Sequence, residues 1–131
     1  MVSYQDWPEF TNIIGGKYKK PRFNGDTADL STFRHDIELG VEIIDSTHPV
    51  TRGMNNFTIH DEGYMNIDMI KSVLPVLKTT NPFCTENIAW HHQYLNSRVV
   101  YILLGHDAQA FRNQHYRKLI GNAIHWVSRG D

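Results

Sequence analysis

Three polar segments contain the residue types that could carry chemistry, and each follows or overlaps an apolar stretch. They are Thr58 to Tyr64, Trp90 to Tyr94 and Leu104 to Asp107. Ligands in open α/β sheets gather beyond the carboxyl ends of the strands. Polar groups placed where strands end are therefore the first candidates for a functional site.

The first segment places His60 beside two carboxylates, Asp61 and Glu62. A histidine next to carboxylates can form an acid–base pair or bind a metal ion. Neighbouring side chains of an extended chain point to opposite faces, so at most one of the two carboxylates can face a given pocket. The alternative is a solvated turn that follows a strand.

His106 directly follows Gly105 and a run of apolar residues, and Asp107 comes next. Glycine lets the backbone approach a ligand closely, and histidine exchanges protons near neutral pH. These properties suit a residue that meets substrate at the end of a buried strand. The competing interpretation of His106 is a loop or helix-capping histidine.

The segment around residues 90–94 favours a structural role. Strand alternation places His91 and His92 on opposite faces, so they cannot chelate one ion together, and Trp90 shares the face of His92. No His-Glu-x-x-His motif, phosphate-binding loop or Gly-x-Ser-x-Gly elbow is present in the sequence. Surface or packing positions are expected for three further histidines: His35, His115 and His125.

Periodicity and turn residues predict the elements that position these groups. Asp6 and Asn113 are the expected N-caps of two helices, and Gly15 and Gly130 are their expected ends. A polar loop is expected over 17–33. The helices are expected over 8–14 and 113–128, and the strands over 37–43, 57–60, 73–79, 88–94 and 98–104.

The predicted sheet lacks part of its cover. The apolar run from Val99 to Leu104 suits a strand buried on both faces, whereas Pro75 restricts its strand to an edge or places it at the strand's start. Two helices cannot cover both faces of five strands, so part of the cover is missing from this chain. The last helix has one apolar face at 3.6-residue periodicity, made of Leu119, Ile120, Ala123, Ile124 and Val127.

Composition excludes several classes of function. The 131 residues, 40% of them hydrophobic, suit a single domain, and the net charge of -1 gives no basic excess for binding nucleic acid. Cys84 is the only cysteine, so no internal disulfide can form, and a small apolar filler is expected there.

The apolar runs are too short to span a membrane. Residues 1–10 resemble no signal or transit peptide, so the cytoplasm is the default expectation, and the periplasm would require an export signal upstream of Met1.

Six segments, taken in order, share motifs with one known family. They read DWPEF and IGG within 6–16, HPVTRG at 48–53, FTIHDEGY at 57–64, IAW at 88–90, RVVYILLGH at 98–106 and YRKLI with a following Trp126 in 116–126. Together they cover nearly the whole chain, and they resemble the motifs of ThuA-like (trehalose-utilisation) domains. Two local features depart from that pattern, namely Leu95-Asn96-Ser97 in place of the family's glycine turn and the pair His91-His92.

The resemblance implies an α/β fold with a flavodoxin-like, class I glutamine amidotransferase-like layered sheet and flanking helices. ThuA-like domains are considerably longer, and their first half supplies the central parallel strands. Residues 1–131 are therefore expected to form a partial ThuA-like domain, its C-terminal half, with the N-terminal half missing. The family lacks a Cys-His-Glu nucleophile, and Cys84 lies at no nucleophile elbow, so glutamine hydrolysis is not expected.

The same resemblance implies a role in carbohydrate metabolism, in the use of trehalose, related disaccharides or 3-keto sugars. We expect Glu62 and His106 to converge at neighbouring strand ends and shape one sugar-sized cleft. The catalytic candidates are Glu62, His106 and Asp61, acting as acid–base partners on a sugar or sugar-derived molecule. The substrate-binding candidates are Tyr64, Trp90 and Asp107. No cofactor is assigned from the sequence, although His106 with a carboxylate, for which Asp61 is a candidate, could bind a divalent metal.

Two other interpretations of the sequence compete with an enzyme. A non-catalytic module that binds carbohydrate or a partner is one. A half-domain exposes sheet surface that needs covering, which favours a homo-oligomer or a partner that supplies the missing half. A truncated fragment without function is the other.

Overall fold

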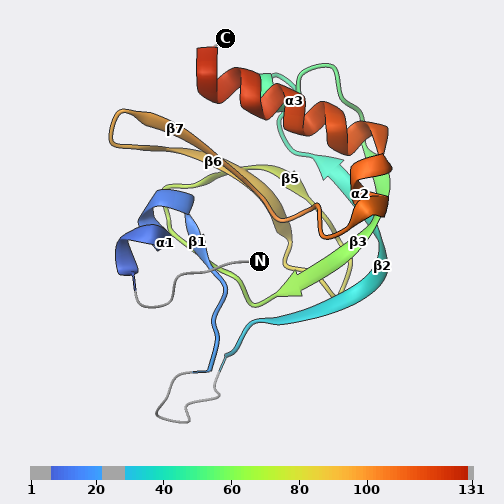
Figure 1. Cartoon of the computed structure of the whole chain (residues 1–131), viewed down its shortest axis with the longest axis horizontal. Helices are drawn as coiled ribbons and strands as arrows, with labels where there is room; N and C mark the ends of the chain where they lie inside the picture. The colour runs from blue at the N-terminus through green and yellow to red at the C-terminus, as the bar shows by residue number, and fades with distance from the viewer. Residues whose placement is uncertain (1–6, 22–28, 130–131) are drawn as a thin grey trace.

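The protein, seen here as a computed structural model that describes residues 7–21 and 29–129, is built on one curled antiparallel sheet (Figure 1). The order of its five strands is β3-β2-β5-β6-β7, so β3 and β7 are its two edges. A second, two-stranded sheet pairs β1 with β4. The strands are β1 (Gly16–Lys17), β2 (Thr32–Ile43), β3 (Phe57–Met65), β4 (Asp68–Met69), β5 (Leu74–Lys78), β6 (Asn87–Tyr94) and β7 (Ser97–Ile102).

The helices lie on opposite sides of the β6–β7 hairpin. Figure 1 shows the long C-terminal helix above this part of the sheet and the first helix below it. No helix among the described residues is both long and apolar enough to cross a membrane. The helices are α1 (Pro8–Ile14), a 3-10 turn η1 (Pro49–Thr51), α2 (Ala108–Arg112) and α3 (Gln114–Arg129).

Helix α1 is attached to the sheet by the side chains of β6 that alternation turns toward it. The indole Nε1 of Trp90 donates to the carbonyl of Ile14 at 2.9 Å, and Nε2 of His92 lies 2.9 Å from the carbonyl of Ile13. These are carbonyls at the end of the helix, where no further turn of helix can satisfy them. Gly15 ends α1 in the left-handed conformation with φ of 80°, as the sequence predicts.

Helix α3 packs on the other side of β6 and holds the turn 48–53. Asn122 donates to the carbonyls of Val50 and Arg52, and Lys118 donates to the carbonyl of Gly53. The Oδ1 atom of Asn113 accepts from two backbone amides at the start of α3, so the predicted N-cap is confirmed. The caps predicted at Asp6 and Gly130 lie outside the described residues.

The strands differ from the prediction in ways that matter for the site. The strand expected at 57–60 continues as β3 to Met65, so Asp61 and Glu62 lie within a strand and not in a turn after it. Every strand pair is antiparallel, and the rule for carboxyl ends of parallel strands does not apply within this sheet. The strand expected at 37–43 begins earlier, at Thr32. Its first residues therefore fall at the end of the loop that was expected over 17–33.

Pro75 lies near the start of β5, which is an internal strand. Strand β2 pairs with β5 only at Leu77 and Lys78. Pro75 lies outside this pairing, so the N–H that proline lacks is not needed for a hydrogen bond to β2. The predicted position at a strand's start is therefore the one adopted.

Two predicted apolar surfaces are only partly buried. All of β7 from Arg98 to Ile102 is half-buried, although its sequence suits burial on both faces. The apolar face predicted for α3 divides into two stripes. Tyr116, Leu119, Ala123 and Trp126 are buried in the core, whereas Ile124 and Val127 are 61% and 41% exposed.

A pair of histidines is packed under α3. The rings of His48 and His91 stack with their centroids 4.0 Å apart, and both approach Trp126. His48 Nδ1 also accepts a hydrogen bond from the amide of Val50 at 3.2 Å, which requires that nitrogen to be unprotonated. Burial lowers the pKa of both imidazoles, and the neighbouring carboxylate of Asp45 opposes this shift more weakly.

We therefore expect the stability of the fold to fall as the pH drops below about 6.5, the ordinary pKa of histidine. Below that pH the unfolded chain binds protons that the folded pair resists, so the stabilisation is complete above 6.5 and is lost as the pH falls toward the lowered folded values. Urea unfolding at pH 7.5 and 5.5 measures the effect. His48→Asn keeps an acceptor for the amide of Val50 and should reduce the pH dependence, whereas His125→Asn, on the exposed face of α3, should not. Equal pH dependence in wild type and His48→Asn would contradict this account.

Candidate active site

The centre of the site is the carboxylate of Glu62, which is almost completely buried. Its side chain is 5% exposed, and each of its oxygens lies 3.0 Å from an imidazole Nδ1: Oε1 from His35 and Oε2 from His106. The hydroxyl of Tyr64 also donates to Oε2. Burial of a carboxylate is unfavourable unless charge and hydrogen-bond partners compensate it, and these three side chains do so.

Strand β3 places Glu62 and Tyr64 on the same face because they are two residues apart. Burial, and then the hydrogen bond to Glu62, raises the pKa of Tyr64 well above its ordinary range. Tyr64 therefore remains protonated and acts as a donor that fixes one carboxylate oxygen. Gly63, between them, is required because a Cβ atom there would lie 2.6 Å from the carbonyl oxygen of Phe83.

His35 reaches Glu62 through a β-bulge in β2. Arg34 pairs with Gly63 and Ile37 with Asp61, so two residues of β2, His35 and Asp36, oppose the single residue Glu62. Asp36 has a φ of 54°, a left-handed conformation that aspartate tolerates better than most residues. A bulge redirects the side chain beside it, and here it turns His35 toward the carboxylate.

The prediction for His35 was therefore incomplete. Its side chain is 52% exposed, as a surface position would be, yet it is a member of the site. The available signal was the pair of polar residues His35-Asp36 at the start of a strand. A bulge cannot be read from alternation, because alternation assumes that no residue is inserted.

Asp61 has a different task from its neighbour Glu62. It is 3% exposed, and its Oδ1 accepts from the backbone amides of Glu62 and His106 at 2.8 and 2.9 Å, while Oδ2 accepts from the amide of Gly105 at 2.7 Å. Only Glu62 contacts imidazoles, as expected for adjacent side chains on a strand. The expected metal pair of His106 with Asp61 stays a prediction, but both oxygens of Asp61 accept from backbone amides, and the carboxylate beside the His106 imidazole is that of Glu62.

The loop 103–107 carries His106 to the site. Gly105 has a φ of 105°, and a Cβ atom there would lie 2.0 Å from the hydroxyl of Tyr116, so the backbone approach requires glycine. Asp107 ends the loop and caps α2, since its Oδ1 accepts from the amides of Gln109 and Ala110. The hydrogen bond from Ala110 is the main cause of the lowered pKa of Asp107. Its expected role in substrate binding stays a prediction.

His106 and Tyr64 open onto a small cleft of about 240 Å³. The side chain of His106 is 41% exposed there, and Tyr101 forms part of the wall. Burial raises the pKa of Tyr101 to about 12, so its hydroxyl is neutral. The remaining lining comes from the end of β7 and the loop after it: Ile102, Leu103, Leu104 and Gly105.

Two residues singled out in the sequence are not part of the cleft. Trp90 is completely buried between Tyr101, on which it stacks at 4.8 Å, and the glycines that follow α1, so it cannot stack on a sugar. Its predicted substrate-binding role is therefore wrong.

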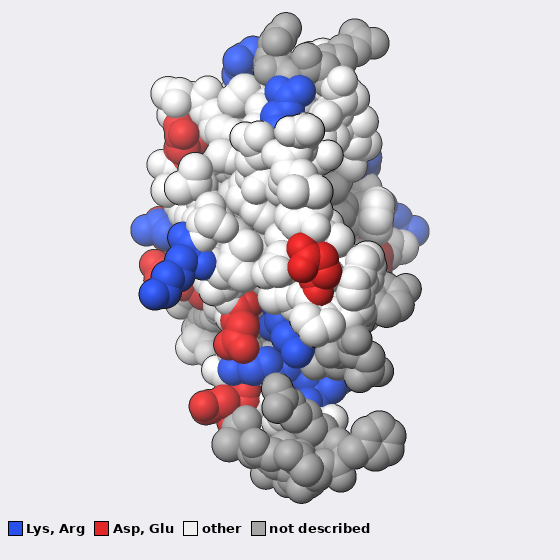
Figure 2. Space-filling model, turned by 90° about the vertical axis from the view of Figure 1, so that its left-hand side faces the viewer, with Lys and Arg blue, Asp and Glu red and all other residues white. Residues whose placement is uncertain are grey.

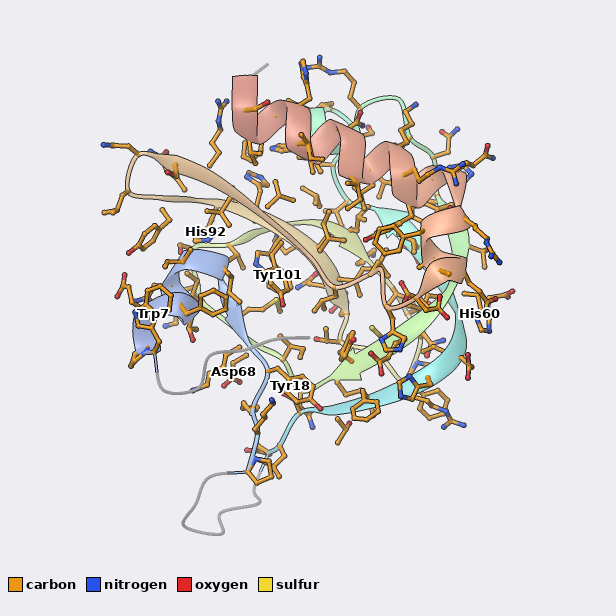
Figure 3. All side chains as sticks on the ribbon, viewed as in Figure 1. Trp7, Tyr18, His60, Asp68, His92 and Tyr101 are labelled. Carbon is orange, nitrogen blue, oxygen red and sulfur yellow. The ribbon has the colours of Figure 1, made fainter. Side chains whose placement is uncertain are left out.

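His60 also lies outside the cleft. It is exposed on β3 opposite Glu38, and Figure 3 shows it pointing away from the molecule, whereas Tyr101 points inward. Cys84 is half-buried, as expected of a filler, and burial raises the pKa of its thiol.

A protein-family model for ThuA, described as trehalose utilisation, matches residues 2–127. The chain belongs to the ThuA family. This family is part of the class I glutamine amidotransferase-like superfamily, so the resemblance noted in the sequence is confirmed.

Solved structures share the fold of this ThuA-family chain. A ThuA-like protein from Parabacteroides merdae matches with a TM-score of 0.80 and 17% identity, over 98% of this chain and 57% of the other. One from Bacteroides uniformis gives 0.70 and 22%, over 99% and 55%. A β-galactosidase from Bacillus circulans gives 0.57 and 10%, over 94% of this chain and 15% of the enzyme. No curated protein matches the chain.

The chain therefore spans little more than half the length of the two ThuA-like structures. Its curled sheet with flanking helices matches theirs, so the expected α/β class and the expected shortfall in length agree with the comparison. The ThuA motifs supply both halves of the contact at the site: Glu62 lies in the segment FTIHDEGY and His106 ends RVVYILLGH. Glu62 and His106 do meet, with Oε2 and Nδ1 3.0 Å apart. The expected neighbouring strand ends are wrong, because Glu62 lies within β3 and His106 follows β7, at opposite edges of the sheet.

We expect Asp61→Asn to destabilise the fold by about 1–3 kcal/mol, because an amide nitrogen cannot accept from the backbone amides that the carboxylate satisfies. Urea unfolding at neutral pH measures the loss. Asp107→Asn is the matched control, since asparagine caps a helix about as well as aspartate. Equal stability of Asp61→Asn and wild type would show that the loop 103–107 does not depend on this carboxylate.

Proposed function

We propose that this chain carries the reactive centre of a sugar-processing enzyme, in which His106, oriented by the buried Glu62, transfers protons to and from a hydroxyl or carbonyl group of a disaccharide or keto-sugar. The observation that carries the proposal is the contact between the buried Glu62 carboxylate and the exposed His106 imidazole at the mouth of a cleft. Membership of a family described by trehalose utilisation supports the substrate class.

Glu62 and His106 would have different roles, because Glu62 is buried and His106 is exposed. Glu62 is inaccessible and held by Tyr64, so it would orient His106 and stabilise the imidazolium that forms when His106 takes a proton. Since Nδ1 of His106 faces Glu62, Nε2 is the ring nitrogen available to substrate. A buried carboxylate that fixes the tautomer and orientation of a histidine is a recurrent arrangement in acid–base catalysis.

The size of the cleft fits one part of a disaccharide. Sites for drug-sized ligands commonly measure about 300–1,000 Å³, and the cleft here is about 240 Å³. We infer that one sugar ring binds beside His106 while the second ring extends to surface outside the cleft. The shared fold of a β-galactosidase is an analogy at the level of fold, and it assigns no role to any residue.

Substitution of the pair tests the proposal. We expect His106→Ala and Glu62→Gln each to reduce the turnover of a 3-keto-disaccharide by about 10²–10⁴-fold, the usual loss when a positioned acid or base is removed. Steady-state assays by product chromatography measure kcat and KM. His60→Ala removes an exposed histidine from the same strand, and it should leave both constants unchanged. Turnover that survives in both His106→Ala and Glu62→Gln would exclude the acid–base roles.

We propose, as a second function, that the surface formed by β7 and the outer stripe of α3 binds the polypeptide that makes up the rest of a ThuA-like domain. A groove of about 370 Å³ runs between them, lined by apolar side chains: Val100, Tyr101, Ile102, Ile120, Ala123, Ile124 and Val127. Strand β7 pairs only with β6 among the described residues, so its other edge presents free backbone groups. Such an edge is a template for a further strand.

Sequence and length both favour this occupant over a small ligand. The run from Val99 to Leu104 has the composition of a strand buried on both faces, yet β7 is half-buried in this chain. The ThuA-like structures contain a further 43% and 45% of their own length that this chain does not span. Figure 2 shows a broad uncharged area on the side of the molecule where the β6–β7 hairpin lies, with acidic and basic residues mixed around it.

We expect the chain on its own to self-associate or to bind the dye ANS through this surface, because an uncovered apolar groove is unfavourable in water. Light scattering and ANS fluorescence measure the two effects. Ile124→Lys, in the groove, should reduce both signals. Ile44→Lys, at a position 45% exposed at the end of β2, should not. A monodisperse monomer that binds no ANS would argue against a missing partner.

A further inference from the structure

We propose that His35, Glu62 and His106 form a binding site for a divalent transition-metal cation, with zinc as the best match. Each residue offers one ligand atom, and these three atoms all lie within 4.8 Å of one another. The site differs from the metal pair expected from the sequence, because Glu62 takes the place of Asp61 as the carboxylate and His35 is a further ligand. The inference concerns the residues of the proposed function and, as far as sugar chemistry is concerned, rests on it, but cation binding can be measured without any substrate.

The donor set decides which cations suit the site. Two imidazole nitrogens and one carboxylate match zinc and other first-row transition metals, whereas magnesium and calcium prefer oxygen ligands. Three protein ligands also leave a position for water or substrate, as catalytic zinc sites do. The open side here is the cleft side, where the His106 side chain is 41% exposed.

The distances require only small side-chain movements. Two ligand atoms about 2.0–2.1 Å from a tetrahedral ion lie about 3.4 Å apart. The two contacts between Nδ1 and the carboxylate are 3.0 Å long, so they are close to this value already. The ligand atoms of the two imidazoles lie within 4.8 Å of each other, and both rings are exposed enough to rotate toward a common ion, with centroids 4.9 Å apart.

The surroundings hold the ligands as the outer groups of metal sites usually do. Tyr64 donates to Oε2 of Glu62 and so orients the carboxylate. Asp61 fixes the backbone amide of His106, and the bulge in β2 fixes the position of His35. Two of these restraints come from β3 and one from β2, and none of them uses a ligand atom of an imidazole.

Charge also favours a cation. In the part of the chain that the structure describes, the ion-pair partners of Glu62 are the two histidines. Arg34 lies next in sequence to His35, but its guanidinium stacks on Phe83 at 3.9 Å from the ring centroid. A metal ion would therefore bring a permanent positive charge to a buried carboxylate whose partners are two imidazoles and a tyrosine hydroxyl. In contact with a sugar, such an ion would polarise a carbonyl or hydroxyl oxygen.

Titration of the tag-free, EDTA-treated protein with zinc chloride tests the site. Isothermal calorimetry at pH 7.5 should show one equivalent bound, and Co²⁺ in place of zinc should give the visible absorption of a tetrahedral nitrogen and oxygen site. His35→Ala should weaken zinc binding by about 100-fold or more, since even outer-sphere changes cost about 10–100-fold. His60→Ala and His125→Ala remove exposed histidines elsewhere and should bind zinc as the wild type does.

Two results would overturn the proposal: no saturable zinc binding by the folded wild type, or unchanged affinity in His35→Ala. Circular dichroism and thermal unfolding establish that each variant is folded. If either result is accompanied by turnover that persists in EDTA and in His35→Ala but not in His106→Ala, the metal site is rejected and the proposed acid–base function remains. Zinc binding that depends on His35, without any turnover of keto-sugars, would support the metal site and reject the proposed sugar-processing function.

Discussion

The carboxylate of Asp61 joins the two ends of the sheet, and the site depends on that connection. Asp61 lies on β3, at one edge, while the amides of Gly105 and His106 follow β7, at the other edge. The curl of the sheet brings these edges near each other, and hydrogen bonds to a buried charge hold them there. Without this link, His106 would have no fixed relation to Glu62, even though each belongs to a well-formed part of the fold.

Two adjacent acidic residues thus serve opposite purposes within one strand. The lone pairs of Asp61 are used by backbone amides, so this side chain is part of the scaffold. The oxygens of Glu62 contact side chains that can exchange protons or release a nitrogen to a ligand. The difference arises from strand alternation, which sends one carboxylate toward the loop and the other toward the imidazoles.

Local patterns in the sequence predicted the elements well, and they predicted part of the site. Helix α3, its cap at Asn113 and the end of α1 at Gly15 follow from side-chain chemistry within a few residues. The pairing of Glu62 with His106 came from motifs shared with the ThuA family. The role of His35 could not be predicted, because it depends on one extra residue in β2 opposite a strand that lies far along the chain. The alternation of residues 90–94 favoured a structural role, and the substrate-binding role that the resemblance implied for Trp90 was wrong. Its partner Ile14 is 76 positions away, so local patterns could not identify it.

The separation of the site residues along the chain has a consequence for folding kinetics. The hydrogen bonds from Asp61 to the loop connect residues 44 and 45 positions apart, and β2 must pair with β3 before His35 is in place. Contacts between distant residues form slowly, because closing a long loop costs entropy before any contact repays it. We therefore expect the three-residue centre to form only once β2 has paired with β3 and the loop 103–107 has met β3. A segment of the chain that lacks β2 or this loop would lack the complete centre.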